Sequence, residues 1–496
     1  MKHYLPVLCR GALLSFISMV AAWLAYSAAE VPAQPVLYSQ LHTFTNSLPD
    51  GNQPLSISLG PDGVIYGVTF GGGTNANPGG TIFKVNRDGS GYAQLHSFDA
   101  TTTGNSNSVT AVPAMTFPQY GGLSLTLSRE GILYGTTLMG GANNQGTVFK
   151  LNRDGSGFAT IRDFGPGDAN PITLMQGNDG ALYGTTWRDG SGAGTIFRLT
   201  TDGNNYTVLY TFTSTDGFMP VEPLMQAQDG LLYGSLYLGT SASQLGTIFK
   251  INPVDHNYTV LRHLAAADGF HPTRLTQMSD GNLYGTVITG PGVSSHGAIF
   301  QMDTNGNNFT LLHTFTNILD GSQLHNGVVA GPNNMLYGVA ESGGNNPGNV
   351  EGTLYQFHVP SGTFTVVYTF NGGTLGPGMQ PLGAVAVGDF SGSGGILFGT
   401  ATSGGATAGS SGYNGVVFSL VVTPPLFVTP TTTPNSSGPT TVFWPAWAQN
   451  YVLQSSTNVG DPNSWTSVNV TNLQFIGVTV TNGAPGAYYR LAYPTF

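Results

Sequence analysis

Residues 37–44 read LYSQLHTF, and this stretch decides how the fold is interpreted. It resembles YTVLYTF at residues 206–212, and similar stretches occur seven times along the chain. A pattern that recurs at a regular interval indicates a repeat architecture, in which each copy forms one small structural unit. The copies end at Phe44, Phe98, Phe164, Phe212, Leu264, Phe315 and Phe370.

Two further patterns also occur seven times. One is an apolar residue followed by Tyr-Gly or Phe-Gly, with the aromatic residue at Tyr66, Tyr134, Tyr183, Tyr233, Tyr284, Tyr337 and Phe398. The other resembles Gly-Thr-Val-Phe-Lys, with the aromatic residue at Phe83, Phe149, Phe197, Phe249, Phe300, Tyr355 and Phe418. In the regular middle of the chain the Tyr-Gly pairs lie 49, 50 and 51 residues apart, which leaves room for four short strands. An insertion around residues 99–118 lengthens the first interval.

We call the four expected strands of each unit A to D. In the fourth unit we expect them at Glu222–Gln228, Leu231–Leu236, Gly246–Ile251 and Tyr258–Leu264. Asp-Gly pairs, which favour two-residue hairpin turns, lie between A and B at Asp62-Gly63, Asp179-Gly180, Asp229-Gly230 and Asp280-Gly281. The alternative, that these aspartates form calcium-binding loops, is the weaker interpretation because turn geometry alone explains them.

The two ends of the array indicate how the units are arranged. Residues 37–44 precede any complete unit, and the seventh unit stops at residues 417–420 without its own strand D. If residues 36–44 pair beside Gly415–Val421, the last unit is completed and a ring closes, which removes exposed strand edges. We therefore expect an all-β fold in which residues 36–421 form a seven-bladed β-propeller closed by the N-terminal strand. A β-solenoid and paired β-sandwiches are the alternatives, and a solenoid would need polar caps.

The composition agrees with a fold built from strands and turns. Only 8% of the residues are charged and 72 of 496 are glycine, whereas helical bundles carry many Lys and Glu residues. No segment shows a sustained 3.6-residue apolar period.

The repeats closely resemble the GloVer tandem-repeat family, which is found in exported bacterial proteins with varied modes of anchoring. The resemblance rests on Leu182-Tyr183-Gly184-Thr185-Thr186 followed by residues 194–199, GTIFRL, and it extends over about residues 36–421. It implies the repeat and export, and it does not point to any particular activity.

The N-terminus has the layout of a secretory signal peptide over residues 1–29. A basic start is followed by the apolar run GALLSFISMVAAWLAYSAA, and Ser27 and Ala29 suit the signal peptidase site. We expect cleavage after Ala29 and a secreted or cell-surface location; an uncleaved membrane anchor is the alternative. Cys9, the single cysteine, would be lost with the signal, so no disulfide is expected. Cleavage would change the net charge from −10 to −12, which makes nucleic acid and anionic lipid poor partners.

The C-terminal part has a different composition. Residues 422–439 are rich in Thr and Pro, which is typical of a linker. Residues 440–496 contain aromatic and alternating segments such as YVLQSS at residues 451–456. They resemble a small β-sandwich module found at the C-termini of exported bacterial proteins, and we expect an accessory domain there.

No catalytic signature is found in the sequence. It has no Gly-x-Ser-x-Gly elbow, no His-Glu-x-x-His, no phosphate-binding loop and no cysteine-based metal site, so no cofactor or metal is predicted. The recurrent basic residues of strand C, Lys84, Lys150, Arg198 and Lys250, are expected to extend over neighbouring blades to solvent. The histidines His42, His96 and His313 occupy one repeated position in strand D, where Tyr210 and Tyr368 replace them in other blades; we expect them to be packing residues.

Residues that break the repeat are the best candidates for a binding site. If A is the inner strand, the D-to-A and B-to-C connections lie on one face of the propeller, and the short A-to-B turns lie on the other. The candidate ligand-binding residues on the first face are Arg188, Asp189, Glu222, His271, Arg274, His325 and Glu341, to which His296 is added as a further charged or polar loop residue. A purely structural pair between Glu222 and Arg274 of adjacent blades is the alternative.

Three functions are compatible with the sequence, because propellers host many activities. The first is a non-catalytic binding or display protein at the cell surface, with carbohydrate as the favoured ligand class and a surface protein as another partner. The second is an extracellular polysaccharide hydrolase or lyase, which would need a carboxylate pair or a His/Tyr/Arg cluster. The third is a purely structural repeat protein. The sequence does not indicate the oligomeric state.

Overall fold

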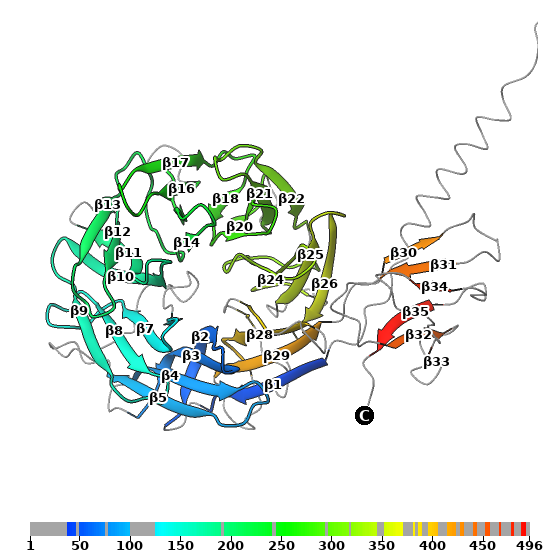
Figure 1. Cartoon of the computed structure of the whole chain (residues 1–496), viewed down its shortest axis with the longest axis horizontal. Coiled ribbons are helices and arrows are strands. Elements are labelled where there is room, and N and C mark those ends of the chain that lie inside the picture. The colour runs from blue at the N-terminus through cyan, green and yellow to red at the C-terminus, as the bar shows by residue number, and fades with distance from the viewer. Residues whose placement is uncertain are drawn as a thin grey trace, which may run out of the picture. The chain divides into compact units, whose positions relative to one another are not determined.

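The computed structural model confirms a propeller of seven antiparallel sheets (Figure 1). It describes residues 37–422 except 46–48, 75–77, 100–124, 190–192, 241–244, 293–295, 317–318, 345–351, 371–379, 382–384, 389–394 and 405–413, together with six strands between residues 427 and 492. The predicted signal peptide and most of the insertion around residues 99–118 lie outside the described residues. No helix among the described residues is long and apolar enough to cross a membrane.

The first four blades each contain four strands, ordered from the innermost to the outermost. Blade 1 comprises β2 (Gly51–Leu59), β3 (Val64–Gly72), β4 (Pro78–Asn86) and β5 (Ala93–Asp99). Blade 2 comprises β6 (Leu125–Leu127), β7 (Ile132–Thr137), β8 (Thr147–Asn152) and β9 (Ala159–Asp163). Blade 3 comprises β10 (Asp168–Gln176), β11 (Leu182–Asp189), β12 (Thr195–Leu199) and β13 (Thr207–Thr211). Blade 4 comprises β14 (Met225–Gln226), β15 (Leu232–Leu236), β16 (Thr247–Ile251) and β17 (Tyr258–His263).

The remaining blades follow the same order, with two variations. In blade 5 the inner strand is divided into β18 (Phe270–Pro272) and β19 (Thr276–Gln277), followed by β20 (Leu283–Thr289), β21 (Ala298–Met302) and β22 (Thr310–Thr314). Blade 6 comprises β23 (Val328–Ala330), β24 (Met335–Ala340), β25 (Thr353–His358) and β26 (Thr363–Thr369). Blade 7 comprises β27 (Ala386–Val387), β28 (Gly395–Ala401), β29 (Val416–Val422) and, as its outer strand, β1 (Leu37–Thr43).

The pairing of β1 with β29 confirms the predicted ring closure. The two strands are antiparallel, with Leu37 opposite Val421 and Thr43 opposite Val416, and the register shifts once between Gln40 and His42. The outer edge of blade 7 is therefore supplied by the N-terminus (Figure 1). This arrangement leaves no unpaired strand edge at the junction of the two ends of the array.

At the glycine of each Tyr-Gly or Phe-Gly pair, an aromatic ring of the neighbouring strand occupies the space that a side chain would need. In blade 3, a Cβ atom added to Gly184 would overlap Cζ of Phe197, which is its partner on the neighbouring strand. The same clash, with the Gly-Thr-Val-Phe-Lys aromatic residue, occurs at Gly67, Gly135, Gly234, Gly285, Gly338 and Gly399. Two of the sequence patterns therefore describe one packing unit, in which the ring of strand C covers the bare backbone of strand B.

A second set of aromatic contacts joins each blade to the next. The His, Arg or Tyr side chain two residues before the end of each strand D pattern, the pattern of residues 37–44, lies against an aromatic ring at the start of strand D in the following blade. His96 stacks on Phe158 at 3.8 Å, Tyr210 stacks on Tyr258 at 3.9 Å, and the Arg162 guanidinium lies 3.8 Å from the Tyr206 ring. The other four contacts are His42 with Tyr92, Arg262 with Phe309, His313 with Phe364 and Tyr368 with Tyr38. The predicted packing role of the three histidines is confirmed.

The fourth unit shows where the expected strand bounds were wrong. Strand A was expected at Glu222–Gln228, but β14 covers only Met225–Gln226. Proline at position 223 has no N–H to donate to a ladder, and it restricts the backbone of the residue before it. Regular pairing therefore begins only after this proline.

The C-terminal strands form a unit separate from the propeller. One sheet contains β30 (Phe427–Pro430), β31 (Thr440–Phe443) and β34 (Val478–Val480); the other contains β32 (Val452–Ser456), β33 (Thr466–Ser467) and β35 (Tyr488–Ala492). The segment predicted as a linker, residues 422–439, thus contains strand β30. Two three-stranded antiparallel sheets agree with an all-β module, and the β-sandwich arrangement stays a prediction.

Candidate functional site

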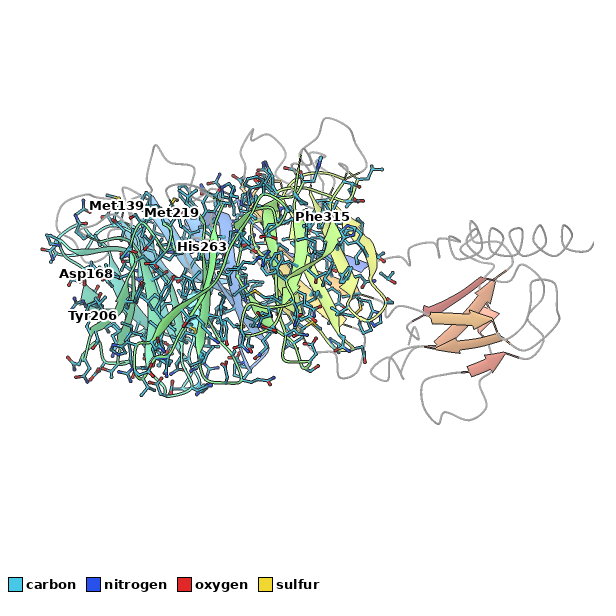
Figure 2. The ribbon with its side chains drawn as sticks, turned by 90° about the horizontal axis from the view of Figure 1, so that it is seen from above. Met139, Asp168, Tyr206, Met219, His263 and Phe315 are labelled. Atoms are coloured by element: carbon cyan, nitrogen blue, oxygen red, sulfur yellow. The ribbon has the colours of Figure 1, made fainter. Side chains whose placement is uncertain are left out.

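The D-to-A and B-to-C connections share one face of the propeller, which we call the loop face. Figure 2 looks across the ring and places Met139, from the B-to-C connection of blade 2, and Met219, from the D-to-A connection of blade 4, at the same end. The opposite side, the turn face, carries the A-to-B and C-to-D turns. This arrangement follows from strand A being innermost and agrees with the sequence-based expectation.

A left-handed residue that is not glycine lies at the junction of the D-to-A connection and strand A, inside the first part of the strand in blades 1, 3 and 5. His271 has a φ of 60°, and the equivalent residues of five other blades, Gln53, Asn170, Met219, Gln323 and Gln380, have φ between 53° and 65°. The backbone N–H of His271 donates to the carbonyl of Leu245 in the preceding blade at 2.8 Å, and Gln53 and Asn170 make the same bond. The unusual conformation is thus stabilised by hydrogen bonds between blades, and the side chain at this position is glutamine in three blades and asparagine, methionine or histidine in the others.

Glu222 and Arg274 occupy the same position, two residues after the proline of the connection, in adjacent blades. Glu222 is buried, and the backbone N–H of Arg274 donates to its carboxyl group. Burial raises the pKa of Glu222 to about 8, and the nearby positive charge of Arg274 opposes this shift. Burial also lowers the pKa of Arg274, and Glu222 opposes that shift. The direct ion pair considered as a structural alternative is not formed between the described side chains.

His325 and Glu341 form a buried pair in blade 6. His325 Nε2 lies 3.2 Å from Glu341 Oε2, and the two side chains are only 8% and 5% exposed. The carbonyl of Gln323 accepts hydrogen bonds from the backbone N–H groups of both residues, which holds the pair at the end of β24. The position of His325 is filled in other blades by the buried residues Leu55, Ile172, Val221 and Thr273. Among the described positions, a histidine–carboxylate pair replaces a small or apolar residue in this blade alone.

His271 connects blade 5 to both neighbouring blades. Its imidazole stacks on the phenol ring of Tyr237 in blade 4, with ring centroids 4.0 Å apart and parallel planes. Burial, together with the electrostatic influence of His325 in blade 6, lowers the pKa of His271 to about 4. His271 is therefore neutral at pH 7. We call Glu222, Tyr237, His271, Arg274, His325 and Glu341 the blade 4–6 cluster.

The structure places five of the seven predicted ligand-binding residues in two groups, Glu222 with Arg274, and His325 with Glu341 and His271. The other two, Arg188 and Asp189, lie at the end of β11, where their backbones pair with Ala169 and Asp168; their side chains are outside the described part of the structure. His296 lies in the B-to-C connection of blade 5, and its Nδ1 atom is buried with no hydrogen-bond partner.

Sequence reasoning missed the aromatic residues at the ends of strand B. Phe70, Trp187 and Tyr237 are half-buried and each lies four residues after the aromatic residue of a Tyr-Gly pair. Glu341 has the same position in blade 6. A comparison of the seven positions four residues after Tyr-Gly would have found them, because the remaining ones are Leu138, Ile288 and Thr402.

The turn face is occupied by structural contacts. The Tyr hydroxyl groups of Tyr183 and Tyr233 donate to Asp179 and Asp229, which also accept backbone N–H groups within the turn. These bonds support the turn interpretation of the Asp-Gly pairs. Lys250 Nζ donates to the carbonyl of Thr304 in blade 5 at 3.0 Å, as expected for a side chain that extends over its neighbour. Within the described residues, no group of three or more potential metal ligands occurs.

Comparisons with known proteins agree with this fold. An oligogalacturonate lyase in complex with manganese has a TM-score of 0.51 at 11% sequence identity, covering 79% of this chain and 94% of the lyase. YCF48 from Cyanidioschyzon merolae has a TM-score of 0.43 at 10% identity, covering 77% of this chain and 98% of that protein. At 11% identity the likeness to the lyase shows the fold alone. No curated protein sequence matches the chain.

The repeat itself has a family match. The model of the Gloeobacter/Verrucomicrobia repeat matches residues 120–322 and, overlapping them, residues 279–442. The two matches together cover more than half of the chain, in agreement with the resemblance found in the sequence. The chain belongs to the Gloeobacter/Verrucomicrobia repeat family.

Proposed function

We propose that this protein is a non-catalytic binding or display protein, secreted or attached to the cell surface, and that its loop face binds carbohydrate. The observation that carries the proposal is the blade 4–6 cluster, where aromatic and polar side chains meet at positions that break the repeat. The repeat-defining rings are buried and unavailable: Phe197, Phe249 and Phe300, for example, are 0% exposed. Binding must therefore use the variable positions.

The chemistry of these positions suits a sugar. Tyr237, which has one ring face covered by His271, and Trp187 are half-buried, and the C–H face of a sugar ring can pack on an aromatic surface of this kind. Polar side chains close to such a surface provide hydrogen bonds that fix the orientation of a ligand. Gln323 and Gln380, on the left-handed connections, contribute amide groups to the same face, where Ser342 and Ser403 donate to their side-chain oxygens.

A test compares glycan binding by the mature protein and by the double variant Trp187→Ala, Tyr237→Ala. We expect the protein to bind one class of glycan on an array, and the double variant to lose at least tenfold in affinity. Val254→Ser is the matched control, because Val254 is 86% exposed in a C-to-D turn on the opposite face. The proposal is wrong if no glycan binds, or if a bound glycan is unaffected by the double variant while both variants melt like the parent.

One observation favours the hydrolase or lyase alternative. Burial raises the pKa of Glu222 to about 8, and a carboxyl group that stays protonated at neutral pH is what a general acid requires. Against this alternative, Glu341, the other carboxylate of the cluster, is already paired with His325. Incubation with extracellular polysaccharides distinguishes the two functions: product formation that disappears in Glu222→Gln would favour the enzyme.

A further inference from the structure

Arg274 differs from most of the other arginines that the structure describes. Arg153, Arg162, Arg198 and Arg262 each form an ion pair with an aspartate, at N···O distances between 2.5 and 3.2 Å. Arg129 donates to the side chain and carbonyl of Asn178. In contrast, no described residue accepts a hydrogen bond from the Arg274 guanidinium, and Glu222 interacts with it only at longer range.

The surroundings of Arg274 remove its side chain partly from water. The side chain is half-buried in the inner strand of blade 5, and it is enclosed enough for burial to lower the pKa of the guanidinium. A guanidinium remains charged in proteins and carries five N–H donors. A guanidinium that is only partly hydrated gains from two charge-assisted hydrogen bonds to an anionic acceptor, so an acceptor supplied by a bound ligand would be stabilised there.

Two neighbours hold Arg274 in this position. The Arg274 stem passes beside Gly327 of blade 6, where an added Cβ atom would lie 2.6 Å from Arg274 Cγ. On the side of blade 4, Glu222 is held by the backbone N–H of Arg274 and not by its guanidinium. No described residue of blades 4, 5 and 6 therefore accepts a hydrogen bond from the guanidinium of Arg274.

We propose that Arg274 binds an anionic group of the ligand, a carboxylate or a sulfate ester carried by a sugar. This inference rests on the proposed carbohydrate-binding function and names the class of glycan, which is acidic. The planar guanidinium matches the two oxygens of such a group with two parallel hydrogen bonds. The protein as a whole carries a net charge of −10, so nonspecific attraction of polyanions does not supply this preference.

The test uses matched pairs of ligands, measured by calorimetry with the mature full-length protein. Oligosaccharides of uronic acids are compared with their carboxyl-reduced neutral counterparts, and sulfated oligosaccharides with their desulfated forms. We expect the acidic member of at least one pair to bind tenfold or more tightly than its neutral counterpart. Which pair shows the preference distinguishes carboxylate from sulfate.

The variants identify the residue responsible. Arg274→Met should abolish the preference while leaving neutral binding in place, and Arg274→Lys should reduce it because a lysine lacks the planar pair of donors. Arg153→Met, on the turn face, is the matched control and should keep the preference. Arg274→Met should also melt at or above the temperature of the parent, because it removes a charge without an acceptor. A preference that survives in Arg274→Met, or a fall of several degrees in its melting temperature, would overturn the inference.

A second measurement separates this inference from the proposed function. Equal binding of acidic and neutral glycans would refute the role of Arg274 and leave carbohydrate binding intact. If no glycan binds, the proposed function fails, and the anion site is then tested with sulfate and acetate, which should raise the melting temperature above that in chloride at equal ionic strength. Equal effects of these anions on the parent and on Arg274→Met would refute the anion site as well.

Discussion

The phenol ring of Tyr38 lies flat on that of Tyr368, with centroids 5.0 Å apart and planes 6° from parallel. Tyr38 is in the closing strand β1, and Tyr368 is in the outer strand of blade 6. The contact is one of seven equivalent contacts between successive blades, and the next, between His42 and Tyr92, joins β1 to blade 1. The ring of stacked side chains is therefore complete only when β1 is in place.

Deletion of residues 36–44 should cause aggregation or a large loss of thermal stability. The deletion leaves the edge of β29 unpaired and removes Leu41 and Phe44, which are 8% and 0% exposed. Calorimetry together with light scattering measures both effects. Tyr38→Ala, which removes one stack and keeps the strand, should lower the melting temperature much less. A deletion variant that melts like the parent would show that β1 does not close the ring.

The blade architecture could be predicted because the repeat encodes it seven times. The glycine of each Tyr-Gly pair packs against the aromatic residue of strand C, as Gly184 and Phe197 show. Because this contact recurs in every blade, the periodicity of the sequence is sufficient to predict the fold. The bounds of the inner strands could not be predicted as well. They depend on the D-to-A connections, where residues such as His271 adopt a left-handed conformation that neither composition nor periodicity indicates.

Tyr355→Phe should stabilise the protein by about 1–3 kcal/mol of unfolding free energy, the usual cost of a buried polar group without a partner. The Tyr355 side chain is fully buried, and its hydroxyl group has no hydrogen-bond partner. The equivalent residues of the other six blades are phenylalanine. Denaturant unfolding measures the change. Tyr233→Phe is a suitable control and should destabilise, because the Tyr233 hydroxyl donates to Asp229 at 2.7 Å.

Acidification should destabilise the protein partly through His96. Burial lowers the pKa of His96 to about 4 from an ordinary value of 6.5. Between these values the unfolded chain binds a proton that the folded protein does not bind, so stability falls as the pH falls from 6.5 towards 4. His96→Tyr, which places the side chain of Tyr210 and Tyr368 at this position, should lose less stability over this pH range. Equal losses in variant and parent would contradict the assignment.

The signal peptide prediction is tested on exported protein. The basic start, the apolar run and the small residues at Ser27 and Ala29 predict cleavage after Ala29. Mass spectrometry of the protein recovered outside the cytoplasm should therefore find Glu30 as the first residue. Detection of Met1 in that material would favour the uncleaved anchor.

The candidate site was predictable only in part, and for a physical reason. His271, Arg274, His325 and Glu341 are recognisable because a charged or titratable residue interrupts a repeated pattern. Which of them contact one another depends on the distance between blades, and this distance is set by the packing of the buried rings. The sequence suggested that Glu222 pairs with Arg274, whereas the structure pairs His325 with Glu341 and leaves the guanidinium without an acceptor among the described residues.

The protonation state of Glu222 provides the last prediction. Burial raises its pKa to about 8 from an ordinary value of 4.5, so the folded protein keeps a proton that the unfolded chain releases. Stability should therefore decrease as the pH rises from 4.5 to 8, and Glu222→Gln, which cannot ionise, should lack this contribution. Melting temperatures of the parent and the variant should diverge in favour of the variant over this range. Glu341→Gln is the control and should instead destabilise, because it removes the partner of His325. Parallel curves for the parent and Glu222→Gln would mean that Glu222 is ionised beside Arg274. The Arg274 guanidinium would then already have a counter-charge, and an anionic ligand would bind it less strongly.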